Sequence, residues 1–272
     1  MGAGQEPVIG GGRFMFIPLH DANHLKHIRL QYVTLGLIAA NVLIWLYTSL
    51  ATEDALQATV IGLGYIPALA FDLAELPAEL VIVPDNLTYI TYAFLHGDFF
   101  HLAGNMLFLW VFGDNVEDAL GHVKFLFFYL ASAAAGAWLH GIVDPNSEVP
   151  LIGASGAVAG VVTAYLMLHP RVKVWVLVLM RLPLRIPAWI PIVLWIAFQF
   201  LMFAAGGEDQ VSWAAHVGGI VAGAVMVVFL RRRGVPLFDR HVVTPRAAEV
   251  ETATAPPLAM PPRRQMPWGR QP

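Results

Sequence analysis

The chain has no cysteine among its 272 residues. Disulfide bonds, a thiol nucleophile and thiolate metal ligands are therefore excluded. Without cysteines, the sequence also gives no information on the redox compartment. Charge is scarce as well: Asp, Glu, Lys and Arg make up 13% of the residues, about half the share in an average soluble domain. With 57% hydrophobic residues and a mean hydropathy of +0.63, this composition predicts a polytopic membrane protein.

Apolar segments of membrane-spanning length follow one another along the chain. A helix needs about twenty apolar residues to cross a bilayer. The predicted spans are 31–50, 99–116, 123–142, 151–168, 186–205 and 213–230. Two further stretches do not qualify. The stretch 51–86 contains three prolines and six acids and is expected to lie at the membrane interface. The short β-branched run within 172–185 is expected to make an interfacial excursion.

Lysine and arginine are absent from the connections after the first, third and fifth spans. All sixteen fall before the first span, at Lys124, between the fourth and fifth spans, or after the sixth. The positive-inside rule predicts this alternation when both termini are cytoplasmic. We therefore expect an all-α integral membrane protein. It comprises a cytoplasmic segment 1–30, a six-helix domain 31–232 and a disordered, proline-rich cytoplasmic tail 233–272.

Polar side chains interrupt the second, fourth and sixth spans. With this orientation Ser155 lies near the outer start of the fourth span, and His216 lies about 5 Å into the sixth. His101 and Asn105, in the outer half of the second span, are four residues apart and share one helix face. Polar groups inside a membrane are costly and usually face the bundle interior. The four side chains are therefore expected at one depth near the outer surface.

These four residues suit nucleophilic catalysis. A serine hydroxyl needs a base within hydrogen-bond reach, and the neutral imidazole of His216 can serve near pH 7. The developing oxyanion needs donors, which Asn105, His101 and the Ser155 main-chain amide can supply. No acid falls at the depth of His216, and Asp98 on the outer approach is assigned no role, so a Ser–His dyad is preferred to a triad.

Glycines beside these residues support this interpretation over an ordinary structural one. A serine at a helix start is usually a cap, and a lone membrane histidine is more often a packing residue. Here, however, Gly153 precedes Ser155, and small-xxx-small faces begin close to the serine and the histidine. These faces, which let helix backbones pack closely, are Gly156-xxx-Gly160 and Gly219-xxx-Gly223.

The same residues resemble the rhomboid intramembrane serine proteases. The resemblance rests on His96-Gly-Asp-Phe-Phe-His101-Leu-Ala-Gly-Asn105, Gly153-x-Ser155-Gly156, His216-x-x-Gly219-x-x-x-Gly223 and Gly113-x-x-x-Glu117-Asp-x-x-Gly121. The last of these is similar to a turn in bacterial members. The resemblance covers about 31–232 and implies a six-helix bundle with a membrane-embedded loop at about 51–88. It also implies a short fourth helix that carries the nucleophile in a water-filled cavity.

Carried over to this chain, the resemblance implies Ser155 as nucleophile and His216 as general base. His101, Asn105 and the Ser155 amide would form the oxyanion site, and Gly153 would permit the tight entry to the fourth span. Two features depart from the family pattern. Ala159 stands where some bacterial members have an aromatic residue against the catalytic histidine, and the first loop lacks a Trp-Arg pair.

The function expected from these features is serine endopeptidase activity toward transmembrane segments of single-span or polytopic membrane proteins, near the outer face. Neither a metal nor a cofactor is expected, and nucleic acid is not expected among the partners. The expected location is a bacterial inner membrane, and the oligomeric state is not readable. Two alternatives stay open. The first is a catalytically silent protein that binds membrane clients, although such a protein would have little need to keep both Ser155 and His216. The second is a transporter, which would need polar residues in the inner halves of spans four and six, where this sequence is apolar.

Overall fold

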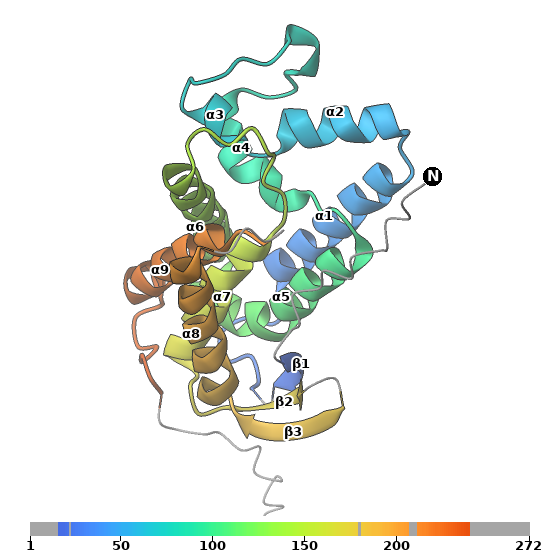
Figure 1. The fold of residues 1–272 in the computed structure, drawn as a ribbon. Helices are drawn as coiled ribbons and strands as arrows, with labels where there is room; N and C mark the ends of the chain where they lie inside the picture. Colours follow the sequence, from blue (N-terminus) through green and yellow to red (C-terminus); the bar gives the residue numbers. More distant parts are fainter. Residues whose placement is uncertain (1–15, 22, 179–180, 207–210, 240–272) are drawn as a thin grey trace, which may run out of the picture. The chain divides into compact units, whose positions relative to one another are not determined.

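The computed structural model describes residues 16–21, 23–178, 181–206 and 211–239. Helices dominate it (Figure 1). The longer ones are α1 (Tyr32–Ser49), α5 (Phe99–Leu120), α6 (His122–Val143), α7 (Ser155–Leu168), α8 (Trp189–Ala205) and α9 (Trp213–Leu230). Each agrees with a predicted span to within about one helical turn. The fourth begins later than predicted, because the backbone of Leu151 pairs with Tyr65 in an isolated bridge instead of entering the helix.

Among the described residues, α1, α6 and α9 are long and apolar enough to cross a membrane. α7 and α8 are apolar but shorter. With 14 residues α7 extends ~21 Å, less than the ~30 Å hydrocarbon core of a bilayer. α5 has 22 residues, but its last turns carry Asp114, Glu117 and Asp118. The short α7 is surrounded by protein, since every residue from Gly156 to Tyr165 is buried.

α7 packs against α5, α6 and α9, and glycines set its distance from α9. A Cβ atom on Gly219 would overlap the carbonyl oxygen of Gly156, and one on Gly223 would lie 2.5 Å from the carbonyl oxygen of Gly160. No larger residue fits at these positions unless the two helices move apart. The small-xxx-small faces of the two spans are therefore in direct backbone contact.

A small sheet corrects the prediction of an all-α protein. It consists of β1 (Phe16–Asp21), β2 (Lys173–Val178) and β3 (Leu182–Pro187), which are antiparallel in the order β1-β2-β3 (Figure 1). Along β2 buried and exposed residues alternate: Val174 and Val176 face the core, whereas Lys173 and Trp175 are exposed. The segment expected to make an interfacial excursion is thus a hairpin, because a core-facing stripe of valines stabilises extended backbone.

The N-terminal strand was also missed. β1 pairs with β2 from Phe16 opposite Val178 to Asp21 opposite Val174. These partners lie about 150 residues apart in the chain, and no local pattern shows such a pairing. Part of the segment expected to be a cytoplasmic lead-in therefore packs on the helical domain. Residues 1–15 of that segment lie outside the described residues.

Short helices occupy the stretch between α1 and α5. They are α2 (Glu53–Leu63), α3 (Pro67–Ala70), η1 (Ala78–Leu80), α4 (Asp85–Thr91) and η2 (Tyr92–Phe94). The prediction that this stretch is too interrupted to span a membrane is confirmed by the lengths of these helices. Three backbone contacts attach it to the loop before α7: the Tyr65–Leu151 bridge, the bond from the Ala68 N–H to the Ser147 carbonyl, and the bond from the Gly153 N–H to the Tyr92 carbonyl.

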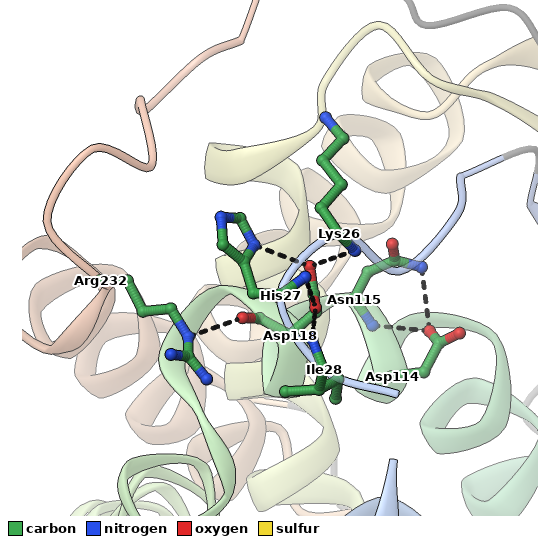
Figure 2. Close-up of polar contacts among 7 residues, drawn as sticks. All are labelled: Lys26, His27, Ile28, Asp114, Asn115, Asp118 and Arg232. Atoms are coloured by element: carbon green, nitrogen blue, oxygen red, sulfur yellow. Dashed lines mark hydrogen bonds and ion pairs between the residues drawn. The ribbon is translucent and has the colours of Figure 1, made fainter. Parts of the chain in front are cut away.

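The C-terminal end of α5 holds the segment that precedes α1. Asp118 accepts hydrogen bonds from the backbone N–H groups of Lys26, His27 and Ile28 at 3.0, 2.6 and 2.7 Å (Figure 2). The His27 ring lies 3.1 Å from the same carboxylate. Arg232, just after α9, donates to the Asp118 carbonyl at 3.1 Å. Asp118 therefore ties three distant segments together.

The neighbouring Glu117 caps α1 from a different helix. It accepts from the N–H groups of Val33 and Thr34 at 3.0 and 2.8 Å and from the Thr34 hydroxyl at 2.6 Å. The residue at the N-cap position of α1, Gln31, makes no side-chain cap bond. Glu117 thus satisfies N–H groups that the first turn of α1 would otherwise leave unpaired. We call Glu117 and Asp118 the carboxylate pair.

Part of the predicted C-terminal tail is described. Val235 is buried, and the Phe238 N–H donates to the Met167 carbonyl at 2.6 Å near the end of α7. Residues 240–272, the rest of the tail that was predicted to be disordered, lie outside the described residues.

Candidate active site

Ser155 is the first residue of α7, and a constrained loop leads into it. Gly153 has a φ of +119°, a conformation that favours glycine. Its N–H donates to the Tyr92 carbonyl at 3.0 Å, which anchors the loop. The Ser155 side chain is half-buried, and its N–H belongs to a helical first turn that offers it no intrahelical acceptor. Among the described residues, no hydrogen bond joins its Oγ to His216, whose Nδ1 instead bonds Gln199.

His101 lies against this loop. A Cβ atom on Gly153 would come within 2.6 Å of Cε1 and Nε2 of the His101 ring, so that any side chain there would displace the imidazole. Asp98 caps α5 by accepting from the His101 N–H at 2.9 Å, which gives this acid a structural role. The His96 ring lies 5.0 Å from that of His101, and its Nε2 lies 3.5 Å from the Ala154 N–H.

Asn105 lies one turn further along α5, on the same face as His101. Its side chain is 8% exposed, and in the described part of the chain its Nδ2 has no hydrogen-bond partner. Buried amide groups almost always find partners, because an unpaired one costs about 1–3 kcal/mol. Asn105 therefore offers an uncommitted donor, which is the property that an oxyanion site requires.

His216 reaches the site through the backbone contact of α7 with α9. A Cβ atom on Gly156 would lie 3.1 Å from the carbonyl oxygen of Ala215. Gly156 directly follows Ser155, and Ala215 directly precedes His216. The contact therefore places the backbone of the serine next to that of the histidine, although the two lie on different helices 61 positions apart (216 − 155).

α8 contributes two residues that the sequence reasoning missed. Gln199 Oε1 lies 2.7 Å from Nδ1 of His216, and the Trp195 ring lies 6.3 Å from the imidazole at an interplanar angle of 33°. Trp213 of α9 meets the same imidazole edge-on at 6.0 Å. The aromatic neighbours of this imidazole therefore come from α8 and α9. The signal in the sequence was that Gln199 is the single amide or ionisable side chain in α8.

The assembled groups are a hydroxyl at a helix N-terminus, an imidazole and a free amide donor, with a second imidazole against the entry loop. Such a set can perform nucleophilic acyl transfer. Within the described residues, no third His, Asp or Glu joins His96 and His101 to form a group that could hold a metal ion.

Comparisons with known proteins identify the family. Residues 85–233 match the rhomboid domain. The chain is 33% identical over 150 residues to Rhomboid protein 1, mitochondrial, of Saccharomyces cerevisiae, covering 53% of this chain and 41% of the relative. It is 31% identical over 136 residues to Presenilin-associated rhomboid-like protein, mitochondrial, of Homo sapiens, covering 49% and 32%. These findings define a mostly helical, multi-pass membrane protein. The chain belongs to the rhomboid family, a family of membrane proteases.

The match covers only part of each relative, and these relatives are not of the predicted bacterial type. The aligned part spans less than half of each of these two relatives, 41% and 32%. A third relative, RHOMBOID-like protein 12, mitochondrial, of Arabidopsis thaliana, is 29% identical over 161 residues, covering 53% of this chain and 46% of the relative. All three relatives come from eukaryotes, and the name of each describes it as mitochondrial. They lend no support to a bacterial type or a bacterial inner membrane, which stay predictions.

Proposed function

We propose that this protein is an intramembrane serine endopeptidase that cleaves other membrane proteins within or beside a transmembrane segment. The observation that carries the proposal is the backbone contact between Gly156 and Ala215, the chain neighbours of Ser155 and His216. Membership of the rhomboid family and the unpaired Asn105 donor support it.

In the proposed reaction Ser155 Oγ attacks the carbonyl carbon of the scissile peptide bond. His216 Nε2 takes the hydroxyl proton and returns it to the leaving amine, after which water enters by the same route and hydrolyses the acyl-enzyme. Asn105 Nδ2, the His101 ring and the Ser155 N–H stabilise the oxyanion. A helical substrate has to unwind locally first, because its carbonyls are hydrogen-bonded within the helix.

The proposed orientation puts both termini in the cytoplasm and the cut near the outer face. It rests on the distribution of the sixteen Lys and Arg residues, which avoid the connections after α1, α6 and α8. Ser155 at the start of α7 and His216 in the first turn of α9 then lie toward the outer surface. Substrates with small or helix-destabilising residues near the cut are expected to be favoured, since they unwind at lower cost.

The test uses the full chain purified in detergent, a fluorophosphonate probe and a model single-span substrate. We expect the wild-type protein to be labelled and to cleave, and Ser155→Ala to lose both activities. Ser49→Ala is the matched control, because its hydroxyl bonds only the Leu46 carbonyl on the exposed side of α1. His216→Ala should also abolish cleavage. Labelling that survives Ser155→Ala would contradict the proposal, and a folded wild-type protein that neither labels nor cleaves would favour the silent client-binding alternative.

A further inference from the structure

The hydrogen bond between His216 and Gln199 joins two deeply buried side chains. Gln199 is 2% exposed, and its Oε1 lies 2.7 Å from His216 Nδ1. All of α8 lies within the described residues, and Gln199 is its single amide or ionisable side chain. The mechanism above assigns no role to this residue.

A second hydrogen bond defines which way round the Gln199 amide lies. Its Nε2 donates to the Trp195 carbonyl at 3.3 Å, one turn back in α8. A carbonyl can only accept, so the NH₂ group has to face Trp195, and the amide oxygen has to face the imidazole. An amide oxygen also only accepts, and His216 Nδ1 therefore carries the proton.

This proton assignment is the one that a general base needs. When Nδ1 carries the hydrogen, Nε2 of the neutral ring holds the lone pair and can take a proton from a serine hydroxyl. The opposite tautomer would have no available lone pair at Nε2. In serine hydrolases with a triad, a buried carboxylate fixes the tautomer in this way.

We propose that Gln199 is the positioning residue of the site: a neutral third member, supplied by α8, that holds His216 in its Nδ1–H tautomer. This inference rests on the proposed function, and it replaces the bare Ser–His dyad with a Ser–His–Gln arrangement. Trp195, one turn away on the same face of α8, packs beside the same imidazole. One face of α8 therefore sets both the tautomer and the ring orientation, and catalytic competence depends on α8 staying docked against α9.

The other neighbours of His216 do not supply this function. Trp213 of α9 meets the ring edge-on, and an indole N–H cannot accept a proton from Nδ1. His101 of α5 is the titratable group that interacts electrostatically with His216. In the described part of the chain, no carboxylate is hydrogen-bonded to His216, so the acceptor at Nδ1 is Gln199.

The kinetic test compares Gln199→Leu and Gln199→Glu with a matched control, Asn41→Leu. Asn41 is a fully buried amide on α1 whose Nδ2 bonds the Leu37 carbonyl. For Gln199→Leu we expect kcat to fall about 10- to 100-fold with little change in KM, less than the ~10⁴-fold loss when a triad carboxylate is neutralised. Asn41→Leu should leave kcat within about twofold, its effect being on the melting temperature.

Gln199→Glu keeps the acceptor and adds a negative charge beside the imidazole. A nearby anion stabilises the protonated ring, so the acid limb of the kcat–pH profile should move to higher pH. Activity above that limb should recover toward the wild-type value. A purely structural role predicts neither the shift nor the recovery. Equal kcat losses in Gln199→Leu and Asn41→Leu, or an unshifted profile in Gln199→Glu, would overturn the proposal.

An activity-independent measurement separates this proposal from the proposed function. ¹⁵N NMR of the histidine-labelled Ser155→Ala variant should show His216 as the Nδ1–H tautomer. The double variant Ser155→Ala/Gln199→Leu should show a mixture of the two tautomers. A tautomer that stays unchanged in the double variant would refute the role of Gln199. A wild-type protein that neither labels nor cleaves but shows the expected tautomer change would refute only the endopeptidase function.

Discussion

The two ends of α5 treat buried polar groups in opposite ways. Toward the N-terminal end, Asn105 has a buried donor that finds no partner among the described residues. At the C-terminal end, the carboxylate pair accepts hydrogen bonds from backbone N–H groups of the segment before and within α1. An unpaired buried group reduces stability, and a saturated one contributes to it. The first end thus leaves a buried donor available, and the second end stabilises the fold.

Asn105→Ala should produce the largest change, and it should affect activity alone. Loss of one oxyanion donor typically lowers kcat by about 10² to 10³. The melting temperature should hardly change, because among the described residues Nδ2 has no partner to lose. The checks are cleavage kinetics with the model substrate and thermal unfolding in detergent. A stability loss as large as that of a carboxylate-pair variant would remove the distinction between the two ends.

Glu117→Ala should show the reverse behaviour. The variant leaves the N–H groups of Val33 and Thr34 and the Thr34 hydroxyl without their acceptor in a buried site. We expect a loss of about 3 kcal/mol in the free energy of unfolding, with the fluorophosphonate labelling rate of the folded fraction unchanged. The control is Glu79→Ala, an exposed acid in η1, which should be neutral. A folded but unreactive Glu117→Ala protein would show that the two ends are coupled.

Gly219→Ala tests the helix contact on which the site depends. Because the new Cβ would overlap the Gly156 carbonyl, α7 and α9 have to separate. Overpacking of this kind costs about 1–3 kcal/mol, and the displacement should also reduce cleavage. Gly36→Ala in α1 is the matched control, since no atom lies within 4 Å of its added Cβ. That variant should be neutral or stabilising by up to ~1 kcal/mol, as for Gly to Ala in a helix interior. Equal melting temperatures for the two variants would contradict the tight contact.

Asp21→Asn should give the smallest effect, which appears only as a change in pH dependence. Burial raises the pKa of Asp21 from 3.8 to about 6, although the hydrogen bond from Tyr165 counteracts this in part. Between pH 4 and 6 the folded protein therefore binds more protons than the unfolded chain, and stability falls as pH rises through this window. Asp114 of α5 is the neighbouring titratable group. Asp21→Asn should flatten this slope in melting temperatures measured from pH 4 to 7, and an unchanged slope would refute the assignment.

Several features could be predicted because they depend on local pattern or on solvent. The positions of the six longer helices follow from runs of apolar residues, each of which matches a described helix to within about one turn. The residues around Ser155, His101 and His216 indicated the family that the comparisons then confirmed. The sheet was missed, because β1 and β2 recognise each other only through a register that spans most of the chain.

The sequence by itself determined the membrane class, the helix positions, the family and the residue types available for chemistry, since hydropathy and helix periodicity act over short distances. Only the tertiary structure decided which polar groups are paired. Glu117 and Asp118 accept hydrogen bonds from groups more than 80 residues away in the chain, and His216 finds Gln199 on a separate helix. Asn105 Nδ2, in contrast, has no partner in the part of the chain that the structure describes. Hydrogen bonds need atoms within about 3 Å, and only the packing of whole helices brings distant residues that close.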